Sequence, residues 1–111
     1  MAIPNFPDSE ALAVLRNAEN HSSQSTLADE IGYSVGKVNY ILKALIEKGF
    51  VKAQRFANSD NKKGYSYLLT KEGIKHKLYL TEKFVQIKKQ EYDELQAELE
   101  KLRKQADAPQ S

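Results

Sequence analysis

The chain has 111 residues and lacks cysteine entirely, and its two histidines, His21 and His76, lie far apart. A chain without cysteine has no disulfide framework and no thiolate metal site. Two distant histidines without neighbouring ligands argue against a zinc site. We therefore expect no metal and no other cofactor.

Long apolar runs are also missing. No stretch reaches the length that spans a bilayer, and the N-terminal M-A-I-P-N-F-P lacks the charged and apolar regions of a secretory signal. The sequence contains no phosphate-cradling glycine loop, no evident pair of catalytic carboxylates and no nucleophile–base constellation. We expect a cytoplasmic protein that is not an enzyme.

Charge is distributed unevenly along the chain. Residues 33–70 hold seven basic and two acidic side chains, and residues 71–89 hold six basic and two acidic ones. Residues 1–32 and 90–111 are both net acidic, so the overall charge of only +2 conceals a basic centre. A basic block between acidic flanks favours a nucleic-acid partner.

Residues 34–49 predict a helix with both ends marked. Ser34 is a suitable N-cap, and Gly49 can adopt the left-handed conformation that ends a helix. Apolar side chains at spacings of three and four predict a buried face, namely Val38, Ile41, Leu42 and Leu45. The opposite face carries Lys37, Asn39, Tyr40 and Lys43. Such a face suits the DNA major groove, although an ordinary amphipathic helix with a solvated face has the same pattern.

The preceding residues favour the DNA interpretation. Residues 24–31 predict a helix capped by Ser23, and Gly32-Tyr33 leaves a very short turn before Ser34. Two helices joined by about three residues that include a glycine form a helix-turn-helix. An earlier helix, capped by Asp8 or Ser9 and running to about Asn20, is expected to bury mainly Leu12, Leu15, Ala11 and Ala18.

A β-hairpin is predicted after Gly49. F-V-K-A-Q-R-F and Y-S-Y-L-L-T are rich in strand formers and flank the polar segment A-N-S-D-N-K-K-G. A hairpin in this position is the wing of a winged helix. Lysines at a loop tip are usually only solvated, but here they would lie beside the duplex. The wing residues expected to contact phosphate or the minor groove are Arg55, Asn58, Asn61, Lys62 and Lys63.

A long final helix is predicted from Lys71 to Lys104, with Thr70 as its cap. Its apolar positions follow a seven-residue repeat that Thr81 and Lys88 interrupt. A helix of about 50 Å outruns a domain this small, so we expect its apolar seam to pair with a second copy. The residues expected at this dimer interface are Leu78, Phe84, Val85, Tyr92, Leu95, Leu99 and Leu102. Parallel and antiparallel pairing both remain open.

The expected fold is mainly α with a small β-hairpin (α+β), a winged helix-turn-helix domain followed by a long dimerisation helix. The expected division is a tail at residues 1–7, a DNA-binding domain at 8–70, the dimerisation helix at 71–104 and a second tail at 105–111.

Several motifs resemble a known family. S-x-G-K-V-N-Y at 34–40, L-K-A-L-I-E-K-G-x-V-K-A at 42–53, F-x-N-S-x-N-K at 56–62 and Y-x-Y-L-L-T-x-x-G-I at 65–74 are similar to those of the MarR-family EPS-associated transcriptional regulators, small bacterial winged-helix proteins. The resemblance implies sequence-specific DNA binding at the nucleoid and an association with exopolysaccharide gene clusters. Members of the wider MarR group are usually longer and frame an effector pocket with helices from both termini. This chain lacks that length, so we do not expect a small-molecule effector.

Roles follow from residue chemistry. Asn39 can bond adenine through two atoms, Lys37 can reach guanine or a phosphate, and Val35 can meet a thymine methyl group. Gly36 permits close approach, Ser34 caps the same end of the helix, and Lys43 is expected at the DNA backbone. Tyr40 is expected either at the backbone or packed at the rim of the domain. A phosphate is expected at Ser23, Gln24, Ser25 and Thr26, where a helix begins.

Two alternatives remain at this stage. A winged helix can also serve as a protein-interaction or assembly module without a DNA role. Double-stranded RNA is a weaker option, because its deep and narrow groove does not admit such a helix.

Overall fold

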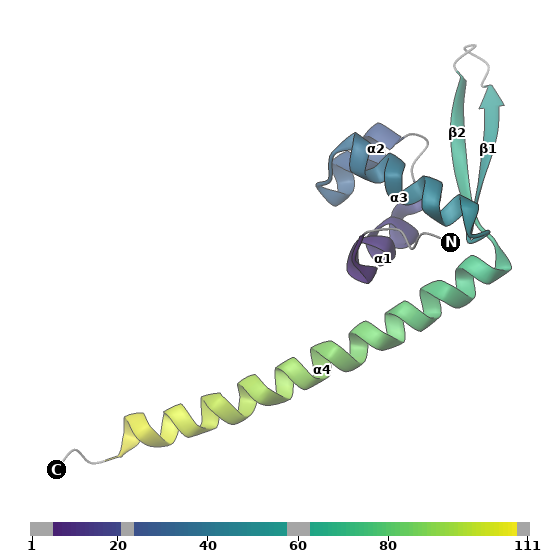
Figure 1. Cartoon of the computed structure of the whole chain (residues 1–111). Helices are drawn as coiled ribbons and strands as arrows, with labels where there is room; N and C mark the ends of the chain where they lie inside the picture. Colours follow the sequence, from purple (N-terminus) through teal and green to yellow (C-terminus); the bar gives the residue numbers. More distant parts are fainter. Residues whose placement is uncertain (1–5, 21–23, 58–62, 109–111) are drawn as a thin grey trace. The chain divides into compact units, whose positions relative to one another are not determined.

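A computed structural model of the chain describes residues 6–20, 24–57 and 63–108. Its elements are α1 (Asp8–Asn17), a 3₁₀ helix (Ala18–Asn20), α2 (Gln24–Ile31), α3 (Val35–Glu47), β1 (Val51–Ala57), β2 (Lys63–Leu69) and α4 (Lys71–Asp107). Three helices, a two-stranded antiparallel sheet and a long C-terminal helix confirm the expected winged-helix architecture (Figure 1).

Helix α1 begins at Asp8, which is one residue earlier than an Asp8 cap and two residues earlier than a Ser9 cap would place its start. Pro7, in an extended conformation, is the N-cap, and its carbonyl oxygen accepts hydrogen bonds from the backbone N–H groups of Glu10 and Ala11. Asp8 therefore falls in the first turn, where a carboxylate favours the positive end of the helix. The prediction of Asp8 or Ser9 as the cap was wrong, because it overlooked that proline can precede a helix directly.

Glycines end both helices of the helix-turn-helix. Gly32 has φ +84°, and its N–H and that of Tyr33 both donate to the carbonyl of Ala28. Ser34 then caps α3, because its hydroxyl accepts from the backbone N–H of Lys37 at 3.1 Å. Gly49 has φ +80° and ends α3, as the sequence predicts. Each reversal is thus set by local chemistry and not by the distant parts of the chain.

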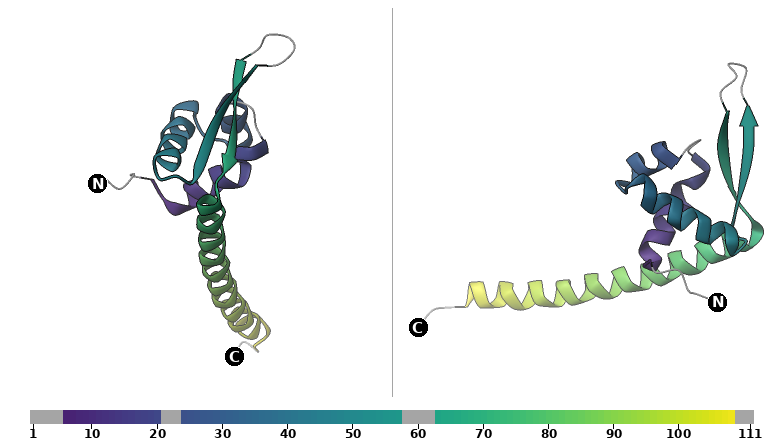
Figure 2. Two further views of the ribbon diagram at one scale, coloured as in Figure 1. Left: turned by 90° about the vertical axis from the view of Figure 1, so that its right-hand side faces the viewer. Right: turned by 45° about the horizontal axis from the view of Figure 1, so that its top comes forward.

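The hairpin is longer than expected. The strands β1 and β2 lie side by side as a long hairpin (Figures 1 and 2). Their register pairs Val51 with Leu69 at the base and Ala57 with Lys63 at the far end, so Ala57, Lys63 and Gly64 belong to strands and not to the polar tip. The segment between the strands shrinks to residues 58–62, which lie outside the described part of the chain.

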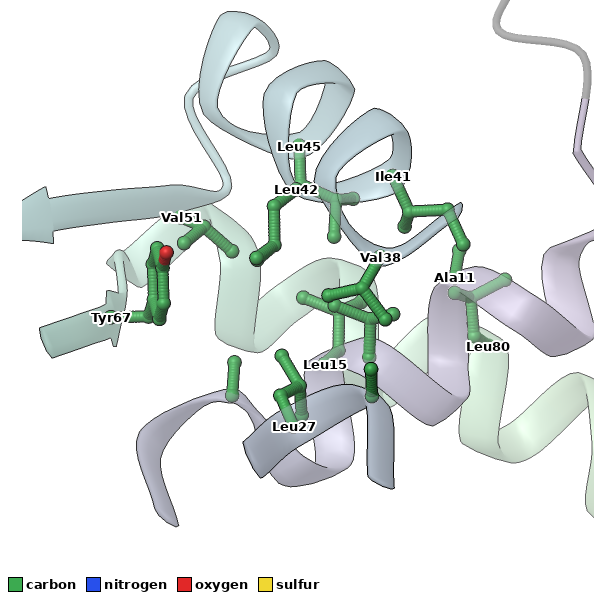
Figure 3. Close-up of a cluster of buried hydrophobic side chains, with 13 residues drawn as sticks. Ala11, Leu15, Leu27, Val38, Ile41, Leu42, Leu45, Val51, Tyr67 and Leu80 are labelled. Carbon is green, nitrogen blue, oxygen red and sulfur yellow. The ribbon is translucent and has the colours of Figure 1, made fainter. Parts of the chain in front are cut away.

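One hydrophobic core joins the helices, the base of the hairpin and the beginning of α4 (Figure 3). The apolar face of α3 lies in it, with Val38, Ile41, Leu42 and Leu45 all buried, as predicted. The other buried members are Ala11, Val14, Leu15, Ala18, Leu27, Ala28, Val51, Tyr67 and Leu80. Leu12 is only partly buried, and Val14, which the sequence analysis did not select, takes the more central place.

The beginning of α4 is fixed to the end of α3 by Thr70. The Thr70 hydroxyl donates to the carbonyl of Gly49 at 2.5 Å and accepts from the backbone N–H of Gly73 at 3.0 Å, so Thr70 caps α4 as predicted. A Cβ atom on Gly73 would overlap the carbonyl oxygen of Phe50. Gly73 is therefore the residue that lets the first turn of α4 lie against the Gly49-Phe50 backbone.

The chain forms two compact units, Met1–Thr81 and Glu82–Ser111. The first unit includes the start of α4, where Gly73 and Leu80 are buried. The expected boundary at residue 70 therefore marks the beginning of α4 and not the edge of a compact unit. The second unit contains the rest of α4, whose described residues form a single helix.

Replacing Gly73 by alanine should destabilise the protein by about 2 kcal/mol or more, because the new methyl group meets backbone and not a movable side chain. Urea unfolding measures the change. Gly36→Ala is the matched control, since no heavy atom lies within 4 Å of a Cβ at that position. It should change stability by less than about 1 kcal/mol. Equal losses in the two variants would contradict the close contact at Gly73.

Candidate nucleic-acid interface

Helix α3 has an exposed surface opposite its buried face. Val35 is 46% exposed, and Gly36, Asn39 and Lys43 are exposed as well. Because an α-helix turns by about 100° per residue, these four positions share one side. We call them the α3 surface. It offers an apolar side chain in the first turn of the helix, an amide in the second turn and a cation one turn further on. These are the groups that read and hold DNA in the major groove.

Lys37 lies on the flank of α3 that faces α1. Its Nζ is 2.6 Å from Oε2 of Glu10 on α1, and it also lies 4.5 Å from the centre of the Tyr33 ring. Lys37 was expected to contact guanine or a phosphate, and Glu10 was not among the predicted site residues. Nothing in the spacing of residues 10 and 37 could have paired them, since only the packing of α1 on α3 brings them together.

Tyr40 was expected either to be available to the DNA backbone or to pack at the rim of the domain, and its side chain is both partly exposed and partly packed. It is 50% exposed, and its ring meets that of Phe6 edge-on with centroids 5.9 Å apart. The contact attaches the segment before α1 to the rim of α3. The ring is thus packed on one side and accessible on the other.

The remaining predicted DNA contacts are only partly described. Thr26 is exposed near the beginning of α2. Ser23, Asn58, Asn61 and Lys62 lie outside the described residues, and only the backbone is described for Gln24, Ser25, Arg55 and Lys63. Their predicted roles remain predictions.

The predicted seam of α4 presents large apolar side chains to solvent. Within the second unit these are Val85, Tyr92, Leu95, Leu99 and Leu102, with Leu95 65% exposed, and Phe84 is half-buried. Leu78, in the first unit, is also exposed. The core contact of α4 is instead made by Leu80, which lies off the predicted repeat. The repeat and the core therefore use different sides of the helix.

A pocket of about 200 Å³ lies within the first unit, between the segment before α1, the end of α3 and the beginning of α4. It is lined by Phe6, Asp8, Ala11, Leu45, Lys48, Phe50 and His76. The His76 ring stacks on Phe50 at 4.4 Å. Burial lowers the pKa of His76, the charge of Asp8 raises it, and that of Lys48 lowers it, with a net lowering.

Two kinds of feature are not found in the described residues. They contain no cluster of histidine, aspartate and glutamate that could hold a metal ion. Within the same ranges, no helix combines the length and apolarity needed to cross a bilayer.

A family comparison agrees with this geometry. Residues 8–52 match the family described as winged helix-turn-helix DNA-binding, a segment that runs from the start of α1 to the start of β1. The match covers helices α1, α2 and α3 of the first unit and agrees with the winged-helix architecture. A comparison with curated protein sequences finds no significant match.

Several solved structures share the fold, and some of them are described as transcriptional regulators. A PadR-like transcriptional regulator from Bacillus cereus superposes with a TM-score of 0.70 at 14% identity, over 78% of this chain and 91% of that one. The smu.1704 protein of Streptococcus mutans gives 0.62 at 25% identity, over 79% and 87%. The PcaV transcriptional regulator of Streptomyces coelicolor gives 0.62 at 20% identity, over 90% and 74%. The MepR F27L mutant of S. aureus, solved bound to an oligodeoxyribonucleotide, gives 0.56 at 18% identity, over 90% and 78%.

The structural neighbours include proteins described as PadR-like and as MarR, so the resemblance expected from the motifs is confirmed at the level of the winged-helix fold. The matched family is described as DNA-binding, and the neighbours share its fold.

The lowered pKa of His76 predicts a pH effect on stability. The folded protein disfavours protonated His76, so the unfolded chain takes up more protons and stability falls as pH drops below the ordinary pKa of about 6.5. His76→Phe keeps an aromatic ring on Phe50 but cannot be protonated. It should lose less stability than the wild type between about pH 7.5 and pH 5.5 in thermal unfolding. Parallel curves for the two proteins would contradict this assignment.

Proposed function

We propose that the chain is a sequence-specific regulator of transcription that binds double-stranded DNA as a homodimer. The observation that carries the proposal is the two-sided α3 helix, with one face buried in the core and the α3 surface exposed beyond its N-cap. The description of the matched family as DNA-binding supports it, as does the basic block at residues 33–89.

In the proposed complex, the α3 surface enters the major groove. Asn39 bonds adenine, Val35 meets a thymine methyl group, and Gly36 allows close approach. Lys43 and the accessible edge of Tyr40 lie at the DNA backbone, and the start of α2, from Ser23 to Thr26, holds a phosphate. The wing adds its cationic and amide side chains along the duplex, namely Arg55, Asn58, Asn61, Lys62 and Lys63. About six phosphate contacts per subunit would contribute roughly −5 per subunit to the slope of log K against log salt.

The proposed dimer forms through the seam of α4. A helix that leaves Tyr92, Leu95, Leu99 and Leu102 in water gains free energy by burying them against another apolar helix. Their alternating spacing of three and four, with Glu and Lys on the flanks, fits a coiled coil of two copies. A two-fold dimer would require a roughly palindromic site, with half-site centres about one helical turn of DNA or a multiple of it apart.

The division of labour proposed here places DNA binding in residues 8–70 and pairing in residues 71–104. On the resemblance alone, we propose that the targets include exopolysaccharide genes. Selection of bound sequences from a random duplex pool would identify the operator. Failure to enrich any sequence would favour the assembly module without a DNA role.

Two sets of substitutions should separate base reading from backbone binding. Asn39→Ala should reduce discrimination between operator and unrelated duplexes by roughly 10-fold, because one bidentate contact is worth about 1–3 kcal/mol. Lys62→Ala with Lys63→Ala should weaken binding to all duplexes alike and make the salt slope shallower by about 2 per subunit, or about 4 for the dimer. Fluorescence anisotropy over a salt series measures both quantities. An unchanged preference in Asn39→Ala would refute its role as a reader.

Leu95→Glu with Leu99→Glu should convert the dimer into a monomer, because two carboxylates would enter the apolar seam. Sedimentation velocity measures the change. Ala97→Glu with Lys104→Gln is the matched control, since it changes net charge equally on the opposite side of the helix. The control should remain dimeric. A dimer that survives in the seam variant would place the interface elsewhere.

A further inference from the structure

The contact between Glu10 and Lys37 joins α1 directly to α3. The Glu10 side chain is 16% exposed and the Lys37 side chain 43%, so the pair is half-buried. Oε2 of Glu10 is buried and accepts no hydrogen bond of good geometry from the described residues. The charge on this oxygen is balanced by the Lys37 ammonium at 2.6 Å. The Tyr33 ring, 4.5 Å from the same nitrogen, adds a second attraction.

Lys37 can therefore neutralise either Glu10 or a DNA phosphate, but one ammonium cannot serve both equally well. Moving it to a phosphate would leave a buried carboxylate oxygen without its counter-charge, which is costly in a half-buried setting. Lys43, by contrast, is exposed on the α3 surface, where a phosphate would replace only water and counterions. We therefore expect Lys37 to stay paired with Glu10 and not to move to a DNA phosphate.

We infer that Glu10 is a positioning residue that withholds Lys37 from the DNA backbone while fixing α1 to the recognition helix. The inference rests on the proposed function and assigns Lys37 a different part from base or phosphate contact. Withholding one cation removes a contact that every sequence would share equally. The pair thereby lowers sequence-independent affinity and leaves the contribution of Asn39 to discrimination undiminished.

The salt dependence of binding to an unrelated duplex tests the inference. Because the substitution is present in both subunits of the proposed dimer, Glu10→Gln should release two Lys37 side chains and steepen the slope of log K against log salt by about 1.8. That change is roughly a 12-fold greater loss of affinity between 50 and 200 mM salt. Lys37→Gln alone should leave the wild-type slope unchanged. In the Glu10→Gln background, however, Lys37→Gln should restore the wild-type slope. Lys43→Gln is the matched control and should make the wild-type slope of the dimer shallower by about 1.8.

Urea unfolding of the same variants reports on the pair without DNA. Lys37→Gln should lower the unfolding midpoint more than Glu10→Gln does, because only Lys37→Gln leaves the buried carboxylate unbalanced. The double variant should unfold at a higher urea concentration than Lys37→Gln. This order of midpoints cannot arise if the two side chains act independently.

The outcomes separate this inference from the proposed function. A shallower slope in Lys37→Gln, or an unchanged slope in Glu10→Gln, with normal wild-type binding, would overturn the withholding role alone. A wild-type protein that binds no duplex would overturn the proposed function, and the withholding role with it.

Discussion

The structure depends first on the burial of one face of α3. Val38, Ile41, Leu42 and Leu45 are contacted from several elements at once, and each such side chain contributes about 1.5–3 kcal/mol when removed from water. Once that face is buried, the rotation of the helix about its axis is fixed, and so is the side that solvent reaches. A rotation that exposed the leucines to bring Lys37 outward would lose most of this free energy. The composition of the exposed α3 surface is thus a consequence of core packing.

A second constraint acts where α3 ends. Gly49 takes a conformation that side chains disfavour, and the N–H of Phe50 returns to the carbonyl of Leu45 at 2.9 Å, which closes the helix. Thr70 then binds the carbonyl of Gly49, and Gly73 lies against Phe50. The base of the hairpin and the first turn of α4 therefore share one short piece of backbone with the end of α3. A shift of the Gly49-Phe50 backbone would therefore displace the end of α3, the base of the hairpin and the first turn of α4 together.

Much of this fold could be predicted because its signals are local. Ser34, Gly32, Gly49 and Thr70 act on neighbouring backbone, and the apolar spacing of α3 leaves one choice of buried face. The predictions that failed or fell short concern choices the local sequence does not decide. Pro7 competes with Asp8 as the start of α1, and α4 has apolar residues on more than one side. Counting the seven-residue repeat finds Leu78 but cannot show that Leu80 is the residue that meets the core.

At the candidate site, the number of lysines in the sequence overstates the positive charge that is available to bind an anion. Counting lysines in residues 33–89 treats each as available to an anion, yet Lys37 lies against the carboxylate of Glu10 from the net acidic first helix. In the proposed complex, the positive charge that α3 presents to DNA is smaller than its sequence suggests, and it is concentrated at Lys43 on the side that carries Asn39. This arrangement would favour the proposed discrimination of one DNA site among many. General attraction raises affinity for every duplex, whereas discrimination depends on the few side chains aimed at base edges.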